Sequence, residues 1–361
     1  MGVKLKDIIV RKKISPQDMQ EKVIAVDAPN IIMGLFNFSR KNQDGSLAGL
    51  LLDSTQRPIG HLYGLLYRIN FFYTKGILPI FCFDGRESNL KRVISKDQLK
   101  DFIFAEKWYK NAIQTGNDNL ARQIALSKDY LWYNVIKESK EILGAMGVPY
   151  INSPSSAEAQ CAHLVKQKIA NYSNSQDFDS LLYRCPFIVQ NLSKLLKRKV
   201  QGRWIYKRIE PVLIDLKKNL TNLRITIFHL IDIALLVGTD FFPGVSGIGA
   251  KKGLTFIRKY NSLENVIKNE KNNYDFSQLS ERVIERVRSI FLFPDVHEQV
   301  SRIYWNIPDK SRIFSLLCED HHLDSKRVKN NLNKLAASYE TCRDTLTHKL
   351  KTVQLTLLDM K

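Results

Sequence analysis

Residues 77–85 read Ile-Leu-Pro-Ile-Phe-Cys-Phe-Asp-Gly, and residues 22–27 read Lys-Val-Ile-Ala-Val-Asp. Each segment is a short apolar run that ends on or next to an aspartate, and stretches with helical character lie between such runs. This alternation predicts an α/β fold with a mainly parallel central sheet flanked by helices. Functional groups in such sheets gather just beyond the carboxyl ends of the strands. We therefore expect Asp27 and Asp84 to lie at one edge of the sheet.

The segment from Arg86 to about Leu143 is charged, helical in propensity and poor in strand signals. Its basic residues include Lys91, Arg92, Lys96, Lys100, Lys107, Lys110 and Arg122. A basic helical insertion between two strands is either a packed crossover or an arch over a site, beneath which a polyanion passes. The sequence leaves both readings open.

Shorter elements are expected further along the chain. The predicted elements are a strand over 148–152, a helix over 157–170, a basic hairpin over 197–208 and an apolar helix over 225–236. Ser153-Pro154-Ser155-Ser156 supplies cap residues for the helix that begins at Ala157. Residues from Ser301 onward are polar and helical in character, and those from about Thr341 lack clear structure signals.

Six acidic residues stand where a reactive site is expected. They are Asp27, Asp84, Glu158, Asp177, Asp179 and Asp240. If residues 175–179 are extended, the carboxylates of Asp177 and Asp179 share one face and Phe178 points into the core. Carboxylates that gather at strand ends repel one another unless a hard cation neutralises them, and Mg²⁺ prefers oxygen ligands. Two such ions about 4 Å apart can hold the attacking and leaving oxygens of a phosphodiester. The alternative is a buried acid network that caps loops.

The segment after Asp240 has the pattern of a helix–hairpin–helix turn. It reads Phe-Pro-Gly-Val-Ser-Gly-Ile-Gly-Ala-Lys-Lys-Gly over residues 242–253. Gly247 and Gly249 allow the backbone to approach a phosphate, and the N-terminus of the following helix favours an anion. Lys251 and Lys252 add positive charge there. Such an element holds a duplex backbone without reading sequence; the alternative is a tight turn between two helices.

The composition agrees with a polyanionic partner. The 361-residue chain carries 55 Lys and Arg against 36 Asp and Glu, a formal charge of +19. Counterion release drives such a chain onto phosphate backbones, although a solvated basic surface is the simpler alternative. The five cysteines form no Cys-x-x-Cys pair, so we expect no zinc site and a reducing interior. We also expect no membrane span and no secretory signal.

Taken in order, these motifs resemble the flap endonucleases of the Rad2/XPG family, and most of all their archaeal members. The resemblance rests on Met1-Gly2-Val3, Asp27-Ala28-Pro29-Asn30, Phe83-Asp84-Gly85 with Leu90-Lys91, Ala157-Glu158-Ala159, Ser175-Gln176-Asp177-Phe178-Asp179, Val237-Gly238-Thr239-Asp240 and Gly247-Ile248-Gly249. It covers nearly the whole chain.

The resemblance implies a PIN-like nuclease domain with a helical arch and a helix–hairpin–helix element. It implies cleavage of 5′ flaps, with 5′–3′ exonuclease activity, at single-strand/duplex junctions. By position, the six acids would hold two Mg²⁺ ions, with Mn²⁺ as a substitute. Lys91, Asp84 and Glu158 would act at the scissile phosphate. Gly2, Arg40 and Arg68 would contact the DNA, together with Lys91, Gly247, Gly249, Lys251 and Lys252.

Three positions depart from the family pattern. Ser156 stands where the family has a further carboxylate, Met33 where it has a base-stacking tyrosine, and Gln98 where it has a basic arch residue, which Lys96 or Lys100 could replace. One lost carboxylate weakens metal binding or misplaces a bound water. The alternatives to an efficient flap nuclease are therefore a weakened paralogue that binds branched DNA and a related nuclease with another junction preference.

The resemblance also implies an organisation and partners. The expected regions are nuclease (1–100), arch and following helix (101–146), internal nuclease (147–240), helix–hairpin–helix (241–300) and C-terminal helices with a tail (301–361). Gln354, Leu357 and Met360 fall where the family's sliding-clamp peptide has its anchors; the alternative is a frayed tail. We expect a monomer that acts on replicating and damaged DNA, in the cytoplasm of an archaeal cell or the nucleus of a eukaryotic one.

Overall fold

The two segments quoted above are neighbouring parallel strands. In a computed structural model that describes residues 2–36, 51–85, 96–192, 195–200, 203–300 and 303–358, β2 (Lys22–Asp27) pairs with β3 (Ile77–Phe83). The register sets Lys22 opposite Ile77 and Asp27 opposite Cys82. Both strands therefore end at the same edge of the sheet, as their sequences predict.

Seven strands form the central sheet, in the order β1-β9-β6-β5-β2-β3-β4. The other five are β1 (Lys12–Lys13), β4 (Tyr150–Asn152), β5 (Tyr172–Asn174), β6 (Phe187–Gln190) and β9 (Val212–Asp215). The strands from β6 to β4 in that order run parallel, while β9 runs antiparallel to β6 and to β1. The prediction of a mainly parallel sheet is confirmed.

Two hydrophobic cores cover the two faces of this sheet. In β2, Ile24 and Val26 join one core and Ala25 joins the other, because successive side chains of a strand point to opposite faces. One core includes side chains of α1 (Ala28–Phe36), α2 (Gly60–Thr74) and α5 (Lys128–Ala145). The other includes side chains of α6 (Ala157–Lys166) and α7 (Asp179–Leu182). A short helical turn, η1 (Pro16–Met19), precedes β2.

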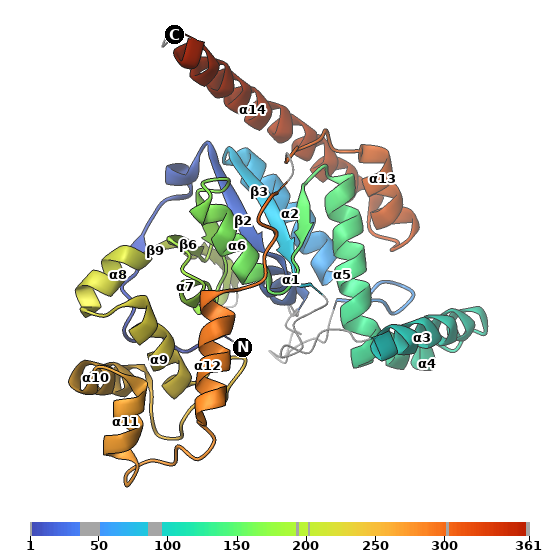
Figure 1. Cartoon of the computed structure of the whole chain (residues 1–361). Helices are drawn as coiled ribbons and strands as arrows, with labels where there is room; N and C mark the ends of the chain where they lie inside the picture. Colours follow the sequence, from blue (N-terminus) through green and yellow to red (C-terminus); the bar gives the residue numbers. More distant parts are fainter. Residues whose placement is uncertain are drawn as a thin grey trace.

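The charged segment after β3 contains a packed crossover helix and two helices that project from the body, and the prediction of an arch over a site stays a prediction. Its three helices are α3 (Lys96–Gln114), α4 (Asp118–Ala125) and α5. The last of these is a packed crossover, since Val135 and Ile142 are buried against the sheet's core. The first two project to one side of the body (Figure 1) and bury a small cluster of their own around Tyr109 and Ala121.

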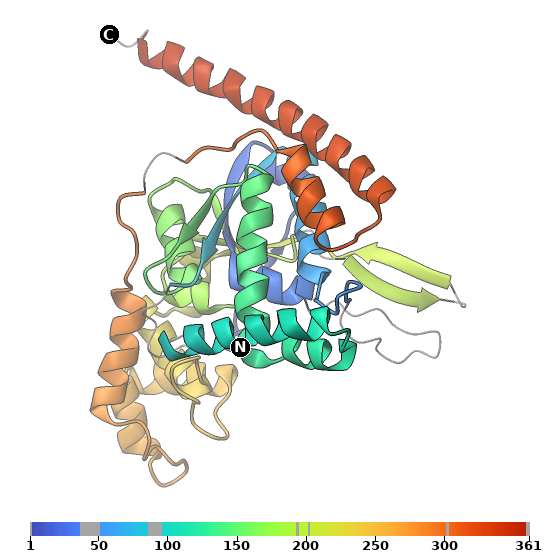
Figure 2. The ribbon, with the colours of Figure 1, turned by 90° about the vertical axis from the view of Figure 1, so that its right-hand side faces the viewer.

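Five helices follow the sheet and form a separate lobe (Figure 1). They are α8 (Leu216–Leu223), α9 (Ile227–Val237), α10 (Ala250–Tyr260), α11 (Leu263–Glu270) and α12 (Glu281–Leu292). The predicted apolar helix begins at Ile227 because Thr226 caps it: its hydroxyl accepts a hydrogen bond from the His229 amide at 3.2 Å. The predicted hairpin is also present, as β7 (Leu195–Val200) and β8 (Arg203–Arg208), and it projects from the body (Figure 2).

The C-terminal prediction is wrong in one respect. After α13 (Lys310–Phe314) and η2 (Ser315–Glu319), helix α14 runs over Ser325–Leu358, so residues from Thr341 onward continue a helix that we expected to lack structure. Val328, Leu332 and Leu335 bury one face of its first half against the body. Once that packing has formed the helix, each further residue adds to it at little cost. Its far end projects away from the body (Figure 1).

Membrane-spanning character is weak. Within the described ranges no single helix is long and apolar enough to cross a membrane, and α8 with α9 meets that test only as a pair bent by 82°.

A carboxylate-rich candidate active site

The first two predicted acids lie side by side at the edge of the sheet. Asp27 is the last residue of β2 and Asp84 follows β3 directly, so the parallel pairing of these strands brings both to the same end. Asp27 is almost fully buried, at 1% exposure. The Ser175 hydroxyl donates to its Oδ2 at 2.7 Å, and the backbone N–H of Asn30 donates to its Oδ1 at 3.4 Å.

Asn30 links this aspartate to the next one. Its Nδ2 donates to Oδ2 of Asp177 at 2.8 Å, and its Oδ1 accepts from the Gln176 amide at 3.0 Å. In the sequence, Asn30 and Ser175 were noted only as members of the family motifs, and their hydrogen bonds to the aspartates were not predicted. The available signal was spacing, because Asn30 lies three residues after Asp27 in the first turn of α1, where residues three apart share a face.

Asp177 and Asp179 do not lie on an extended segment, so that expectation is wrong. Phe178 has helical backbone angles (φ −88°, ψ −4°) and Asp179 begins α7. Phe178 is nevertheless buried in the core, as predicted. Both carboxylates instead face the N-terminal segment: the Val3 amide donates to Oδ1 of Asp179 at 2.8 Å, and a Cβ on Gly2 would lie 2.6 Å from that of Asp177.

Asp84 and Glu158 meet at the N-terminus of α6. Oδ1 of Asp84 accepts a hydrogen bond from the Ala157 amide at 2.8 Å, which satisfies a free N–H of the first turn. Ser156 occupies the N-cap position but makes no capping bond, because its hydroxyl donates to Oε2 of Glu158. The position where the resemblance implies a further carboxylate is therefore in contact with Glu158.

The ionisation of Asp177 is affected by its burial and by two neighbouring acids. Burial raises the pKa of Asp177, and the negative charges of Glu158 and Asp240 raise it further, while the bond from Asn30 opposes them. Asp240 follows α9 in a turn closed by a hydrogen bond from the Thr239 amide to the Phe242 carbonyl at 2.7 Å. A carboxyl group whose ionisation is disfavoured by burial and by two neighbouring carboxylates would be stabilised by a cation.

Among the described residues, the acids lie near one another but do not form a complete metal-binding site. In the part of the chain that the structure covers, no three His, Cys, Asp or Glu side chains stand in an arrangement ready to hold a metal ion. Several of the carboxylates accept structural hydrogen bonds, as the loop-capping alternative predicts. The donor set itself, made of carboxylate oxygens, suits a hard cation such as Mg²⁺.

The predicted DNA-binding turn lies at the start of α10. Gly249 is the N-cap of this helix, and Gly247 has a positive φ of 81° that favours glycine. Lys251 and Lys252 are exposed, but Lys252 donates from Nζ to the Gly247 carbonyl at 2.9 Å and lies 5.1 Å from the centre of the Tyr274 ring. Lys252 thus stabilises the turn, whereas Lys251 extends toward solvent.

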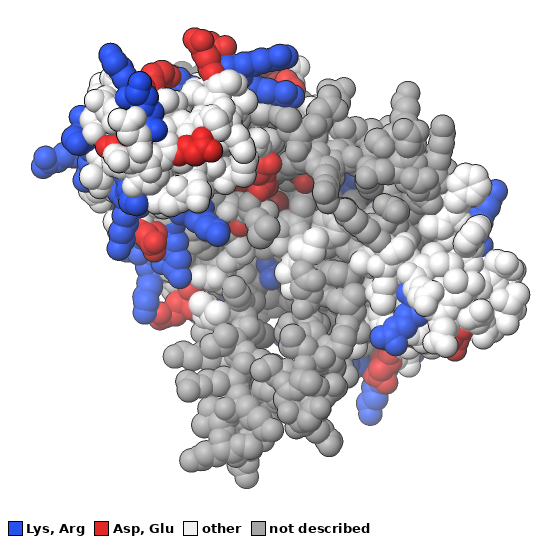
Figure 3. Space-filling view, turned by 90° about the horizontal axis from the view of Figure 1, so that it is seen from below, with Lys and Arg blue, Asp and Glu red and all other residues white. Residues whose placement is uncertain are grey.

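Charge is distributed unevenly over the face seen in Figure 3. Lys and Arg side chains, with some acids among them, gather over the α8–α12 lobe, and further acidic side chains lie near the middle of the view.

The remaining predicted residues are more scattered. Arg68 lies on α2, where burial lowers its pKa to about 10, and its Nε and Nη1 have no hydrogen-bond partner among the described residues. Met33 is exposed on α1. Gln354 and Leu357 belong to α14. Arg40, Lys91 and Met360 lie outside the described residues.

Comparison with known proteins identifies the family. The profile of the XPG N-terminal domain matches residues 1–100, and that of the XPG I-region matches residues 147–240. The chain is 35% identical to flap endonuclease 1 of Archaeoglobus fulgidus over 94% of its own length and 98% of that protein.

Solved structures agree. The flap endonuclease-1 from Methanococcus jannaschii superposes with a TM-score of 0.72 at 28% identity, covering 94% of this chain and 99% of that one. The catalytic core of Rad2 in complex with DNA substrate shares the fold, with a TM-score of 0.62 at 20% identity over 90% of this chain and 95% of that one. The α/β fold of the present chain is thus the PIN-like fold that the resemblance implied, and the chain belongs to the flap endonuclease 1 family of structure-specific nucleases.

Proposed function

We propose that this nuclease cleaves 5′ flaps at single-strand/duplex junctions with two Mg²⁺ ions held by Asp27, Asp84, Glu158, Asp177, Asp179 and Asp240. The observation that carries this proposal is the gathering of carboxylates beyond the strand ends, where burial and then the charges of Glu158 and Asp240 raise the pKa of Asp177. When bound, two hard cations would supply charge to the attacking and leaving oxygens of the phosphodiester. Mn²⁺, which also takes oxygen ligands, should substitute.

The chain's own residues would orient this chemistry. Ser175 and Asn30 hold Asp27 and Asp177 by hydrogen bonds of 2.7 and 2.8 Å. Gly2 packs against Asp177, which keeps the N-terminal segment next to the reacting phosphate. The resemblance assigns Lys91 to that phosphate, together with Asp84 and Glu158. Amides at the start of α10, with Lys251, would grip the duplex backbone, and Arg40 and Arg68 would contact the junction.

A direct test uses Asp177→Asn. With a double-flap substrate and Mg²⁺, wild-type protein should release the 5′ flap. The variant should lose more than about a hundredfold in rate, above the loss expected when a group that only orients a ligand is removed. Glu285→Gln, which neutralises an exposed acid on α12, is the matched control. Wild-type protein that leaves the substrate intact with both Mg²⁺ and Mn²⁺ would refute the proposal.

A second candidate is a weakened nuclease whose main role is to bind branched DNA. Ser156 favours it, because a hydroxyl stands at the position of a family carboxylate and bonds to Glu158. This candidate predicts salt-sensitive binding to flaps with little turnover. Robust multiple turnover would exclude it, and a panel of flap, nick, bubble and four-way junction substrates would reveal a different junction preference.

The tail suggests how the enzyme reaches its substrate. We propose that Gln354, Leu357 and Met360 dock on the ring-shaped sliding clamp (PCNA) and that the monomer acts in Okazaki fragment maturation and DNA repair, beside the chromosome in an archaeal cytoplasm or a eukaryotic nucleus. Removing residues 351–361 should abolish co-elution with the clamp and leave flap cleavage without the clamp unchanged. Equal co-elution of the full and shortened chains would contradict clamp docking by the tail.

A further inference from the structure

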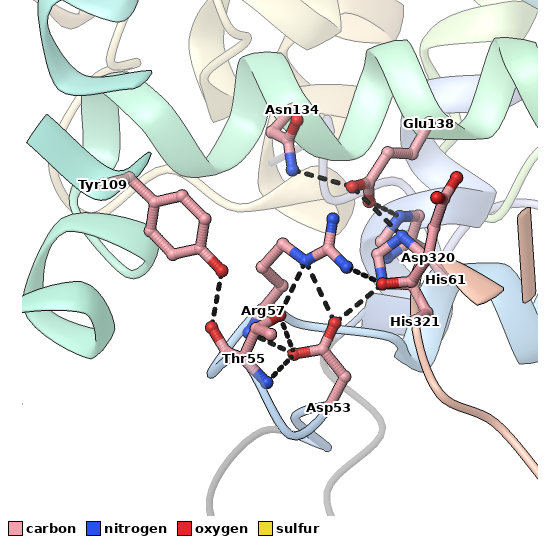
Figure 4. Close-up of polar contacts among 9 residues, drawn as sticks. All are labelled: Asp53, Thr55, Arg57, His61, Tyr109, Asn134, Glu138, Asp320 and His321. Carbon is pink, nitrogen blue, oxygen red and sulfur yellow. Dashed lines mark hydrogen bonds and ion pairs between the residues drawn. The ribbon is translucent and has the colours of Figure 1, made fainter. Parts of the chain in front are cut away.

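Four buried ionisable side chains from distant parts of the chain form a connected row away from the acidic site (Figure 4). Nδ1 of His321 lies 2.9 Å from Oδ2 of Asp53, and its Nε2 lies 3.3 Å from Oε1 of Glu138. Oε2 of Glu138 lies 2.9 Å from Nε2 of His61. Side-chain exposure is 0% for Asp53 and His61, 5% for His321 and 11% for Glu138. None of these four residues was singled out from the sequence.

The row joins the base of the projecting helices to the C-terminal turn. Glu138 belongs to α5, His61 to α2, and His321 lies between η2 and α14. Around them, Arg57 donates from Nε to Asp53 at 3.0 Å and from Nη2 to the Asp320 carbonyl. Tyr109 of α3 donates its hydroxyl to the Thr55 carbonyl at 2.5 Å. Contacts from α3, through Tyr109, and from α5, through Glu138, therefore meet at this row.

The geometry requires a proton on His321. Both of its ring nitrogens face carboxylate oxygens, which only accept hydrogen bonds when ionised. A neutral imidazole has one N–H, so one nitrogen would present a lone pair to a carboxylate. Only the imidazolium form satisfies both contacts at once, which makes this histidine sensitive to pH near neutrality.

The neighbouring carboxylates favour the protonated form of His321. Burial opposes protonation of His321, but its hydrogen bonds to Asp53 and Glu138 outweigh burial and raise its pKa above the ordinary 6.5, although the Arg57 charge opposes them. Burial also opposes ionisation of Glu138, but hydrogen bonds from His321 and His61 lower its pKa to about 2.

The other titratable groups that line the adjoining cavity of about 170 Å³ come from α3, α5 and the C-terminal turn. They are Glu106, Tyr109 and Lys110 on α3, Lys137 and Glu141 on α5, and Asp320.

We infer that His321 and Glu138 are positioning residues of the nuclease, forming a proton-dependent latch that holds α3 and α5 against the segment before α2 and the C-terminal turn. The latch rests on the proposed function, because α5 leads through β4 into Ser155 and Glu158 at the acidic site. The carbonyl of Ser155 accepts a hydrogen bond from the Gly85 amide at 2.8 Å, next to Asp84. A shift of α5 would therefore reach the acids.

The pH dependence has a defined sign. Because the pKa of His321 is raised, the stability that its protonated form contributes is fully present below pH 6.5. That contribution is lost as pH rises through the raised pKa. Because the pKa of Glu138 is lowered to about 2, its contribution is present above 4.5 and is lost as pH falls through that lowered value. The latch is therefore fully closed in mildly acid solution and opens on the alkaline side.

The test compares three variants of the full chain. His321→Lys keeps a permanent cation, His321→Gln removes the titrating group, and His322→Asn changes an exposed neighbouring histidine as the control. The thermal midpoint and the single-turnover rate on a flap substrate are measured from pH 6 to 9. The wild-type rate relative to that of His321→Lys should fall as pH rises over this range, and His322→Asn should follow the wild type.

A histidine proton NMR titration supplies a readout that does not depend on activity. One ring resonance, missing in His321→Gln, should titrate with a midpoint above 6.5, the ordinary histidine value. If His321→Gln does not fold, comparison with His321→Lys assigns the same resonance. A midpoint at or below the ordinary value, or parallel rate profiles for wild type and His321→Lys, overturns the latch. Loss of flap cleavage by wild type at every pH would instead refute the proposed function.

Discussion

At the residue scale, Ser156 stands where the sequence resemblance implies a further carboxylate. Its hydroxyl is buried and donates to Glu158, while Asp84 caps the helix that Ser156 begins. The serine therefore stabilises the remaining carboxylate without contributing a charge of its own. A site with one carboxylate fewer should bind Mg²⁺ more weakly, because Mg²⁺ affinity rises with the number of charged oxygen ligands.

We predict that Ser156→Glu lowers the Mg²⁺ concentration needed for half-maximal flap cleavage by about tenfold, the lower end of the effect of a group that supports a metal ligand. A Mg²⁺ titration of the single-turnover rate measures it. Ser156→Gln has nearly the same size without the charge and is the control. An unchanged Mg²⁺ midpoint in Ser156→Glu would mean that the six acids suffice.

Asn30 supports a second prediction at this scale. It donates to Asp177 at 2.8 Å and accepts from the Gln176 amide at 3.0 Å, so Asn30→Ala leaves the carboxylate without its orienting partner. The rate of flap cleavage should fall by about 10- to 100-fold, as for other groups that orient metal ligands. Circular dichroism should show an unchanged fold. Wild-type activity in the variant would show that Asp177 needs no such support.

These residues also show how far the sequence reaches. Asp27 and Asp84 were predictable because an apolar strand that ends on an acid constrains where that acid lies. Asp177 and Asp179 were assigned to the site, yet their segment was predicted to be extended, and it turns into α7 instead. The contact of Asn30 with Asp177, 147 positions away, and those of the His321 row, 77 to 268 positions apart, were missed because no local pattern encodes such long-range contacts.

At the element scale, one arginine of α12 links this helix by ion pairs to two other helices of its lobe. Arg288 makes a two-pronged contact with Asp232 of α9, with both bonds at 2.8 Å, and a bond of 2.7 Å to Glu264 of α11. The Asp232 side chain is only 3% exposed and that of Arg288 is 25% exposed. Without the arginine, a buried carboxylate would lose its partner.

Arg288→Met should therefore lower the free energy of unfolding by about 3 kcal/mol, the lower end for breaking a buried ion pair, because the arginine is partly exposed. Urea denaturation measures the change. Arg286→Met alters an exposed arginine of the same helix and should change stability by no more than about 0.5 kcal/mol. Equal effects in the two variants would mean that the bridge contributes little.

The helices after β3 and at the C-terminus differ in how well their sequences describe them. Helical character over 86–143 was evident from composition, but only packing decides that α5 joins the core while α3 and α4 project. The continuation of α14 through Leu358 was not predicted, because a helix that packing has already formed extends along the chain at little cost and needs no strong local signal.

At the scale of the whole molecule, the net charge of +19 does not describe where a polyanion binds. Lys and Arg side chains gather over the α8–α12 lobe, while acidic side chains lie near the middle of the view (Figure 3). Duplex DNA held by that lobe would bring a junction to the acids, so affinity and cleavage depend on different parts of the surface. Lysines of the lobe should then control salt dependence without changing the chemistry.

The two lysines at the start of α10 allow this separation to be tested. Lys251 is exposed, whereas Lys252 bonds to the Gly247 carbonyl at 2.9 Å and supports the turn. Lys251→Ala should reduce the slope of log affinity against log salt by about 1 for a nicked duplex, because one phosphate contact is lost. Lys252→Ala should lower affinity with a smaller change of slope, because the lost contact is internal to the protein. Binding is measured by fluorescence anisotropy between 50 and 200 mM salt, the range over which such contacts are resolved, with Ca²⁺ in place of Mg²⁺. Identical slopes for wild type and Lys251→Ala would mean that the duplex does not reach this turn.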